Sequence, residues 1–291
     1  MKNAQLQTNC SLAGFTTWGV GGPADYVLVP RSLEELSEAL QETPADMPIT
    51  WLGLGSNVLI RDAGIRGLVI LTHKGLSAMT ETASGIHVEA GVPCAKLAKW
   101  GAKHDKPDAA FFAGIPGTIG GALFMNAGAF GHETWKFVNT VDTINRRGEI
   151  SHYPANHFNA EYRHIIGLGQ DEWFVAGDFQ FETNTSAEAK TAIKALLQKR
   201  NDAQPIGLRS CGSVFRNPPG DYAARLIEAC GLKGKTLGGA QVSEKHANFI
   251  INTGAALAAD IESLIHMVQD TVKQETGIHL QAEAKILGEA T

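Results

Sequence analysis

Short runs of apolar and β-branched residues recur along this chain, and their lengths and spacing predict a series of strands. Such runs between turns that contain glycine, proline or serine are typical of buried strands. They occur at 24–29, 49–54, 67–72, 86–90, 173–181 and 247–252. Residues 137–150 have the pattern of two further strands that turn near Arg147 and Gly148.

Helices are predicted where the apolar residues recur at helical spacing instead. Ser32 and Glu35 form a capping-box pattern, and leucines follow at helical spacing, which predicts a helix over 33–42. Pro93 suits the first turn of a second helix that continues to about residue 103. Short strands mixed with a few helices in this way predict an α+β fold.

The last third of the chain has a different composition. Small and polar residues replace the apolar runs at 183–190, which we interpret as a domain boundary. A helix is predicted after it, with one face formed by Ala189, Ile193, Leu196 and Leu197. Asp260 is predicted to cap a later helix, which Gly277 ends. Residues 278–287 alternate between apolar and polar, which predicts a final strand with Glu283 on its polar face.

The longest uncharged stretch, residues 109–131, contains six glycines. Its length would suffice to span a bilayer, but the glycines, Pro116 and Asn126 make a poor helix and argue against a membrane span. Glycine lets the backbone adopt positive φ and lets a ligand approach the main chain closely. The stretch is either a ligand-cradling loop or a buried structural crossover, and the glycine content favours the loop.

A second glycine-rich turn, GLGSN from Gly53 to Asn57, lies between two predicted strands. It lacks the third glycine of the dinucleotide-binding pattern, because Val58 occupies that position, and a strand follows where a helix should start. The turn suits a diphosphate site made of main-chain N–H groups and the Ser56 and Asn57 side chains. A tight turn without a ligand explains these residues equally well.

Composition narrows the class of protein. A length of 291 residues favours two domains, and a net charge of −5 gives no general attraction for nucleic acid or anionic lipid. The four cysteines are widely spaced without a CxxC pair, as expected for free thiols in a reducing compartment and not for a metal site. The N-terminus has no apolar segment long enough for a signal peptide, so the cytoplasm is the expected location.

Six separated motifs follow one another in a recognisable order. They are TWGVGGPADY at 17–26, GLGSNVL at 53–59, GIPGTIGGALFMNAG at 114–128, the pair Tyr162-Arg163, GSVFRNP at 212–218 and the strand around Glu283. Together they resemble the MurB family, the UDP-N-acetylenolpyruvoylglucosamine reductases of bacterial peptidoglycan synthesis. The resemblance covers roughly residues 15–288 and is closest to the type II form, which lacks an extra substrate-capping loop.

This resemblance implies an FAD-binding domain of the vanillyl-alcohol-oxidase (PCMH) type over residues 1–182 and a substrate-binding domain over 183–291. FAD would be bound non-covalently, because GLGSN lacks the histidine that covalent members of the superfamily use. The residues that the resemblance assigns to FAD are Gly53, Leu54, Gly55, Ser56, Asn57, Val58, Leu59, Gly114, Ile115, Pro116, Gly117, Gly120, Gly121, Asn126 and Gly128.

The implied reaction has two halves, in which NADPH reduces FAD and the hydride then passes to the enolpyruvyl group of UDP-N-acetylglucosamine-enolpyruvate. Hydride addition leaves negative charge beside a carboxylate, so the site needs a cation, a second polar group and a proton donor. The resemblance gives these roles to Arg163, Glu283 and Ser213, respectively. Each also has an ordinary explanation: a surface ion pair beside Glu161 for Arg163, a solvated strand residue for Glu283 and a turn hydroxyl for Ser213.

The contacts to the UDP-sugar are predicted less directly, and five residues are the candidates. They are Tyr162, Asn217, Lys245, His246 and Asn248, of which His246 is equally consistent with a structural histidine. The chain departs from the common family pattern at three positions, Gly19, Ile165 and Lys285, and the lysine lacks the fork geometry of arginine.

Two other functions remain open at this point. A flavin oxidase of the same superfamily would not require GSVFRNP or the three catalytic residues. A non-catalytic flavin-binding module would keep both glycine loops and could lose the reactive side chains. The presence of all three side chains favours the reductase, with a small-molecule UDP-sugar and NADPH as partners, no nucleic acid or membrane, and a monomer more than an obligate oligomer.

Overall fold

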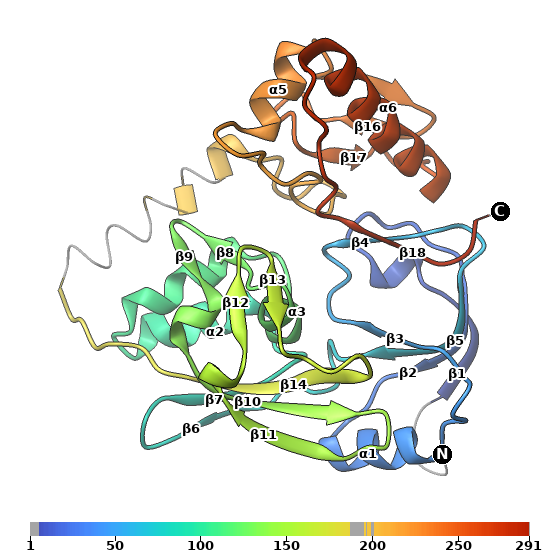
Figure 1. The fold of residues 1–291 in the computed structure, drawn as a ribbon. Helices are drawn as coiled ribbons and strands as arrows, with labels where there is room; N and C mark the ends of the chain where they lie inside the picture. The colour runs from blue at the N-terminus through green and yellow to red at the C-terminus, as the bar shows by residue number, and fades with distance from the viewer. Residues whose placement is uncertain (1–5, 187–194, 196, 199–200, 291) are drawn as a thin grey trace. The chain divides into compact units, whose positions relative to one another are not determined.

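A computed structural model describes residues 6–186, 195, 197–198 and 201–290. By their contacts they form two compact units, each made from more than one stretch of the chain (Figure 1). The first unit consists of Met1–Gln7, Tyr26–Leu54 and Gly67–Gln198. The second consists of Thr8–Asp25, Gly55–Arg66 and Lys199–Thr291.

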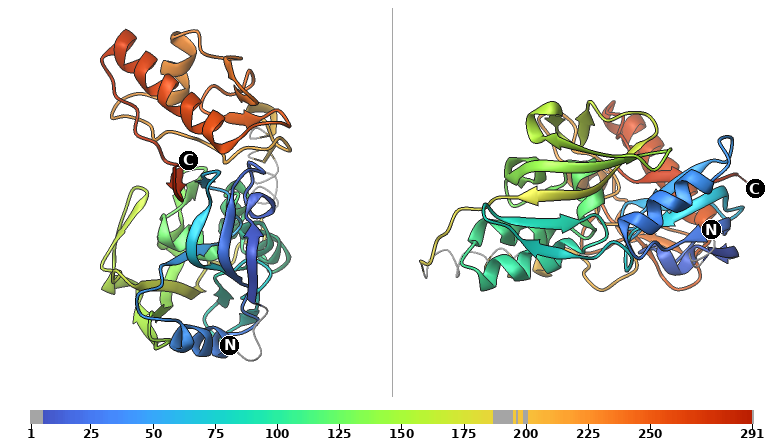
Figure 2. Two further views of the ribbon diagram at one scale, coloured as in Figure 1. Left: turned by 90° about the vertical axis from the view of Figure 1, so that its right-hand side faces the viewer. Right: turned by 90° about the horizontal axis from the view of Figure 1, so that it is seen from below.

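A four-stranded sheet packs against one helix of the first unit. The strand order is β1 (Leu6–Ser11), β2 (Pro23–Leu28), β5 (Ile65–Leu71) and β3 (Ile49–Leu52), and β3 pairs with β5 in parallel. Helix α1 (Leu33–Glu42) packs its apolar face into a core that includes Leu28 and Leu68. The Ser37 hydroxyl on α1 donates to the carbonyl of Gly148 at 2.7 Å, which fixes the helix beside the turn of a second sheet (Figure 2).

That second sheet is antiparallel and has five strands. Their order is β11 (Ile150–Pro154), β10 (Val138–Asn145), β14 (Glu172–Phe179), β7 (Ile86–Glu89) and β6 (Met79–Glu81). Helices α2 (Cys94–Lys103) and α3 (Ile119–Phe124) and the 3₁₀ segment η2 (Pro107–Gly114) share a core of aliphatic and aromatic side chains with it. No helix among the described residues has the length and apolar character that crossing a membrane requires.

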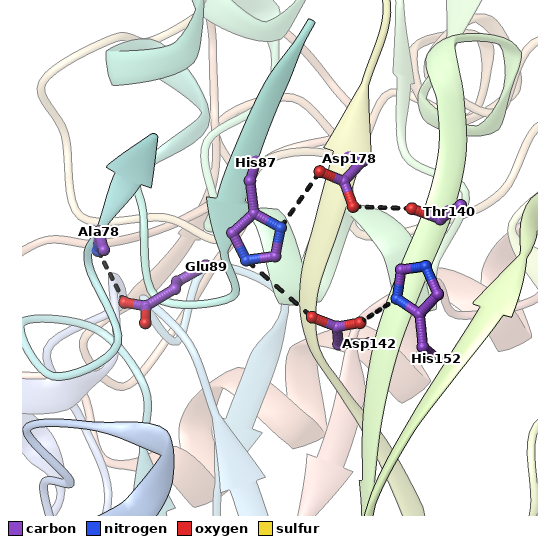
Figure 3. A network of polar contacts seen from close by, with 7 residues as sticks. All are labelled: Ala78, His87, Glu89, Thr140, Asp142, His152 and Asp178. Atoms are coloured by element: carbon purple, nitrogen blue, oxygen red, sulfur yellow. Dashed lines mark hydrogen bonds and ion pairs between the residues drawn. The ribbon is translucent and has the colours of Figure 1, made fainter. Parts of the chain in front are cut away.

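The other side of the five-stranded sheet carries a row of paired polar side chains, because residues alternate between the two faces of a strand. His152 Nδ1 lies 2.6 Å from an Asp142 oxygen, and His87 Nδ1 lies 3.2 Å from Asp178 Oδ1 (Figure 3). The Thr140 hydroxyl donates to the other Asp178 oxygen at 2.7 Å. These cross-strand pairs stabilise the polar face. Within the described residues, no group of three or more His, Cys, Asp or Glu side chains is arranged to hold a metal ion.

Shorter elements complete the first unit. Two hairpins extend from it, β8 (Gly128–Ala129) with β9 (His132–Glu133), and β12 (Asn159–Glu161) with β13 (His164–Ile166). The 3₁₀ segments η3 (Thr134–Phe137) and η4 (Ala155–His157) lie between strands of the same region.

The second unit has its own sheets, helices and core. Strands β15 (Thr236–Leu237), β16 (Ala240–Val242) and β17 (Ile250–Asn252) form one sheet, and helix α6 (Ala258–Thr276) packs on it. Strand β4 (Val58–Ile60) pairs in parallel with β18 (Lys285–Leu287), while α5 (Ala223–Ala229) contacts α6. The 3₁₀ segment η1 (Ala13–Phe15) also belongs to this unit. The core is built around Trp18, Phe215, Leu226, Ile261, Leu264, Val268 and Leu280.

Charged side chains tie residues 55–66 to the C-terminal part of the second unit. Arg61 binds Glu262 with two hydrogen bonds of 2.9 and 2.7 Å. The Asp62 carboxylate accepts hydrogen bonds from the main-chain N–H groups of Ala258 and Ala259, so it caps the first turn of α6. These contacts, together with the β4–β18 pair, explain why a stretch near residue 60 clusters with the last third of the chain.

The structure confirms most predicted elements and corrects the last strand. The mixed α+β content is as predicted, the Glu35 N–H donates to Ser32 Oγ at 3.2 Å, and Gly277 ends α6 in the left-handed conformation with φ of 76°. The strand predicted over 278–287 is wrong in extent, because only Lys285–Leu287 belongs to a strand. The segment changes partners along its length, from the Phe215 region to β4, and this interrupts the ladder.

Two other predictions have a different outcome. The helix after the boundary falls mostly on Ala189, Ile193 and Leu196, which lie outside the described residues. The units defined by contacts are discontinuous in sequence, whereas the domains predicted over 1–182 and 183–291 are continuous. That functional assignment therefore remains a proposal.

Candidate functional site

The second unit places Ser213 and Glu283 on neighbouring segments of the chain. The Glu283 N–H donates to the carbonyl of Val214 at 2.7 Å, and Phe215 forms an antiparallel bridge with Ala282. The pairing brings together two stretches that are separated by about seventy residues in sequence. Two of the three side chains that the resemblance assigns to catalysis are therefore held in one local framework.

Glu283 differs from the other polar residues of its segment. His279, Gln281 and Lys285 are exposed, whereas Glu283 is partly buried. Burial and the negative charge of Glu283 raise the pKa of the nearby Cys211 thiol far above its ordinary value. Cys211 therefore keeps its proton at neutral pH. The burial of Glu283 fits a site residue better than a freely solvated strand residue.

Asn57 joins the glycine turn GLGSN to the Glu283 segment. Its side-chain nitrogen donates to the main-chain carbonyl of Glu283 at 3.2 Å. Its own carbonyl accepts from the Lys285 N–H at 2.9 Å, at the start of the β4–β18 pair. A residue predicted to bind the cofactor thus also holds the segment that carries a predicted catalytic residue.

Asn248 also holds the segment that follows Ser213, through bonds to Val214 and Phe215. Its carbonyl accepts from the Val214 N–H at 2.9 Å. Its side-chain oxygen accepts from the Phe215 N–H at 2.9 Å, and its side-chain nitrogen donates to the Phe215 carbonyl at 2.8 Å. Asn248 is 4% exposed, and both polar atoms of its side chain are used by the protein.

The other predicted substrate residues of the second unit are also engaged. The exposed Asn217 accepts from the Ala223 N–H at 3.1 Å through Oδ1, at the start of α5. The Lys245 ammonium donates to the Asn201 carbonyl at 2.7 Å. His246 Nδ1 accepts from the Asn248 N–H at 3.3 Å, and burial is the main cause that lowers the pKa of His246.

In the first unit, Arg163 occupies the turn of the β12–β13 hairpin. Its backbone adopts a left-handed conformation with φ of 57°, which costs an L-residue of this type about 1–2 kcal/mol. Its guanidinium lies 5.4 Å from the centre of the Tyr162 ring. Asn126 supports the hairpin, because its side-chain nitrogen donates to the Glu161 carbonyl at 3.1 Å. Strain at a charged residue is more often maintained at functional sites than elsewhere.

A cavity of about 440 Å³ adjoins this arginine within the first unit. It is lined by Gly128, Phe130, His132, Lys136, Tyr162 and Arg163, among others. The structure therefore brings three predicted residues together here, one from the glycine stretch and two from the Tyr-Arg pair. Among the charged lining residues, Arg163 and Lys136 outnumber the one carboxylate, Glu133, so the cavity has a net positive character that suits an anionic ligand.

The two glycine-rich loops meet in the first unit at Gly53 and Thr118. A Cβ at Gly53 would lie 2.2 Å from Thr118 Oγ1, so only glycine fits there. That hydroxyl oxygen is buried and has no hydrogen-bond partner among the described residues. A buried polar atom normally has a partner, so the orphaned hydroxyl fits a site completed by a polar ligand such as a diphosphate.

Other predicted cofactor residues have mixed roles. The N–H groups of Ile119 and Gly120 donate to the carbonyls of Val92 and Ala90, so this part of the glycine stretch also acts as a structural crossover. In the second unit, the Ser56 hydroxyl has no partner among the described residues. A serine that contributes no internal hydrogen bond remains available to a ligand.

Sequence reasoning missed two residues of this region. Thr118 lies inside the motif GIPGTIGG, but only the glycines, Ile115 and Pro116 were assigned to the cofactor. A hydroxyl flanked by glycines was the available signal. Lys136 lines the cavity beside Arg163, and its Nζ lies 3.4 Å from His132 Nδ1. No pattern around Lys136 distinguishes it from a solvated lysine.

Comparison with known families and proteins gives consistent results. The profile of the UDP-N-acetylenolpyruvoylglucosamine reductase C-terminal domain matches residues 204–287, and that of an FAD binding domain matches residues 24–153. The UDP-N-acetylenolpyruvoylglucosamine reductase of Coxiella burnetii is 54% identical over 95% of this chain and 94% of its own length. The corresponding protein of Legionella pneumophila is 53% identical over 98% of this chain and 94% of its own length.

The fold is also similar to that of a protein with a solved structure. The crystal structure of the UDP-N-acetylenolpyruvylglucosamine reductase (MurB) from Thermus caldophilus superposes with a TM-score of 0.83 at 30% sequence identity. The match covers 98% of this chain and 99% of that chain. Sequence and fold therefore agree over nearly the full length of both proteins.

Proposed function

This chain belongs to the UDP-N-acetylenolpyruvoylglucosamine reductase family, and we propose that Arg163, Ser213 and Glu283 carry out the family's chemistry in it. It is an FAD-dependent oxidoreductase of peptidoglycan synthesis, with NADPH as hydride donor. It contains an FAD-binding domain of the PCMH type and a C-terminal domain of the MurB type.

Bound FAD would supply the methylene carbon of the enolpyruvyl group with a hydride that originates from NADPH. The new C–H bond moves an electron pair of the double bond onto the adjacent carbon, which carries the carboxylate. Arg163 binds this carboxylate and stabilises the negative charge that develops on it. Glu283 contacts the same group. Because the negative charge that develops there disfavours an ionised carboxylate beside it, Glu283 takes up a proton in the occupied site and donates a hydrogen bond.

Ser213 then supplies the proton that completes the product. Its O–H bond breaks as the second C–H bond forms, and the serine oxygen regains a proton from solvent. Serine is a weak acid, but a carbanion is a far stronger base than the serine alkoxide, so transfer is feasible once the hydride has arrived. The observation that carries this assignment is the hydrogen bond from the Glu283 N–H to the Val214 carbonyl, which supports a joint role for two neighbouring segments.

The residues present fit an FAD site in two respects. The buried Thr118 hydroxyl, which lies against Gly53, lacks a protein partner among the described residues, and Ser56 is not engaged by them either. We assign these residues to the diphosphate, with Thr118 added to those predicted from the sequence. We also propose that FAD is non-covalent, since GLGSN contains no histidine. Flavin that stays with the chain after denaturation and precipitation would contradict this.

The remaining assignments are also proposals. The FAD-binding function is assigned to residues 1–182 and UDP-sugar binding to residues 183–291, with Tyr162 as a further substrate contact from the first part. The cytoplasm is the proposed location, because all four cysteines are free thiols. A monomer is the proposed state in solution, and light scattering coupled to size-exclusion chromatography tests it.

The decisive experiment is anaerobic NADPH oxidation with and without UDP-N-acetylglucosamine-enolpyruvate. We expect oxidation beyond one equivalent per flavin only when this substrate is present. A flavin oxidase would instead turn over when oxygen is admitted without the substrate. A non-catalytic flavin-binding module would show no substrate-dependent oxidation under either condition.

A further inference from the structure

We propose that Asn248 is a positioning residue that holds Ser213 in place for proton transfer, and this inference rests on the proposed role of Ser213. Ser213 lies directly before the two residues that Asn248 binds. The Asn248 carbonyl accepts a hydrogen bond from the Val214 N–H. The Asn248 side chain accepts from the Phe215 N–H and donates to the Phe215 carbonyl. One residue therefore supplies three hydrogen bonds to the segment next to the serine.

The three bonds act together with the Glu283 segment. The Val214 carbonyl accepts a hydrogen bond from the Glu283 N–H at 2.7 Å. Asn248 does not bind this carbonyl, so the two contacts restrain different groups of the segment. The segment after Ser213 is therefore held from both sides, like a central strand between two partners. Asn248 takes the place of one strand, because its amide presents a donor and an acceptor as a peptide group does.

The residue before Ser213 has no comparable restraint from its own conformational preference. Gly212 adopts a left-handed φ of 82°, and glycine populates that region as readily as others. The position of the serine hydroxyl therefore depends mainly on Val214 and Phe215, the next two residues of the chain. A displacement of about 1 Å of a reacting group can slow a reaction by about 10²-fold.

The side chain of Asn248 acts on the substrate through Ser213 and not by a contact of its own. It is 4% exposed, and its oxygen and nitrogen are both bonded to Phe215. The sequence predicts Asn248 as a contact to the UDP-sugar. We instead assign it an indirect role, in which it acts on the substrate through Ser213.

Asn248→Asp tests the inference, because it keeps the size of the side chain but replaces the donor to the Phe215 carbonyl by an acceptor. In the FAD-loaded protein, we expect NADPH to reduce the flavin at the parent rate, within about twofold. We expect single-turnover product formation to slow by about 10- to 100-fold. Hydrogen exchange at the substrate methylene in deuterated water should persist, because the step that fails is the proton transfer.

Asn252 provides a matched control in the same unit. It is 8% exposed, and its side chain donates to the Trp18 carbonyl at 2.8 Å and accepts from the Gly254 N–H at 2.8 Å. Asn252→Asp should lower thermal stability by a similar amount without separating the two half-reactions. If both variants slowed product formation equally while leaving flavin reduction unchanged, the effect would follow from disturbing any buried asparagine in this unit. The positioning role of Asn248 would then be wrong.

A double-mutant comparison separates this inference from the proposed function. In a Ser213→Ala background, Asn248→Asp should cause little further slowing, since the group that it positions is gone. If Ser213→Ala alone turns over like the parent, the assignment of Ser213 is wrong. If Ser213→Ala is slow and Asn248→Asp slows both half-reactions equally, or neither, only the positioning role is wrong.

The milder variant Asn248→Gln covers the case in which Asn248→Asp does not fold. It keeps the amide oxygen and nitrogen on a longer side chain. We expect product formation to slow less than in Asn248→Asp, again with flavin reduction unchanged. If neither variant gives a folded protein by circular dichroism while Asn252→Asp does, Asn248 is required for the fold and the inference fails.

Discussion

The Asn57 side chain donates a hydrogen bond of 3.2 Å to the main-chain carbonyl of Glu283, although 226 residues separate them in sequence. Asn57 belongs to the loop that we assign to FAD, and Glu283 is a proposed catalytic residue. Parallel pairing of β4 with β18 brings them together within the second unit. The proposed flavin loop and the proposed catalytic glutamate therefore share a structural support, and this support is the basis of the first prediction.

Asn57→Ala should slow substrate reduction more than its effect on flavin binding explains. Loss of the hydrogen bond costs about 1 kcal/mol, or about fivefold in rate if the transition state bears the whole loss. Gln269→Ala is the control, because Gln269 donates to the Leu280 carbonyl of the same segment at 2.9 Å. At saturating FAD, stopped-flow absorbance should show a slower second half-reaction for Asn57→Ala only. Equal slowing in both variants would show that the segment as a whole is loosened.

Ser213→Ala is the second prediction and separates hydride transfer from proton transfer. Flavin reduction by NADPH should remain unchanged, while turnover falls by about 10²–10⁴-fold, the range typical of a lost general acid. Ser213→Cys keeps an ionisable proton at nearly the same place and should recover part of the rate. Full activity of Ser213→Ala in steady-state assays would show that the proton comes from water or another side chain.

The third prediction concerns Arg163 and Glu283, which are proposed to act on the same developing charge. Arg163→Ala and Glu283→Ala should each slow the second half-reaction by about 10²-fold, the scale of losing one preorganised stabilising group. Reduction of the flavin by NADPH should change little in either variant. Stopped-flow absorbance resolves the two halves, and a similar loss in both halves would indicate a role in folding or flavin binding.

Backbone strain at Arg163 gives a fourth prediction, which concerns stability. Glycine relieves the left-handed φ of 57°, whereas alanine retains the Cβ that causes the strain. Relief of the strain stabilises the glycine variant by about 1–2 kcal/mol, and the greater freedom of glycine in the unfolded chain offsets part of this gain. We therefore expect Arg163→Gly to be about 0.5–1 kcal/mol more stable than Arg163→Ala. Both variants lose the guanidinium, so neither should reduce substrate well. Urea unfolding monitors the difference, and equal stability would show that the turn relaxes around alanine.

Local signals account for the parts of the fold that were predicted. Helix α1 begins where Ser32 and Glu35 form their capping pattern, and α6 ends at Gly277, because caps depend on residues a few positions apart. The last segment was predicted as one strand from its alternation. Its partners change near Glu283 from the Phe215 region to β4, and no local pattern encodes that change.

The site was predictable only as far as its motifs extend. The glycines and the three proposed catalytic residues lie in motifs, so the resemblance alone could propose them. The proposed roles of Asn248 and Asn57 as supports for catalytic segments depend on pairings between distant parts of the chain. The left-handed backbone of Arg163 also could not be predicted from the sequence, because arginine has no preference for that conformation.

The last prediction is a loss of stability at mildly acidic pH that originates at His246. Burial is the largest cause that lowers the pKa of His246 in the folded protein, with the nearby positive charge of Lys233 acting in the same direction. A hydrogen bond of the ring to the backbone and the negative charge of Glu228 oppose this shift. His246 Nδ1 must be unprotonated to accept from the Asn248 N–H.

Proton linkage gives the direction of the effect. Below about pH 6.5 the unfolded chain protonates this histidine while the folded protein resists protonation, so the unfolded state binds more protons and the unfolding free energy falls as pH falls. His246→Gln removes the titration and should show a weaker fall between about pH 7.5 and 5.5 in urea unfolding at fixed FAD concentration. Above that range the two proteins should differ by a constant amount. Parallel curves over the whole range would show that His246 protonates equally in both states.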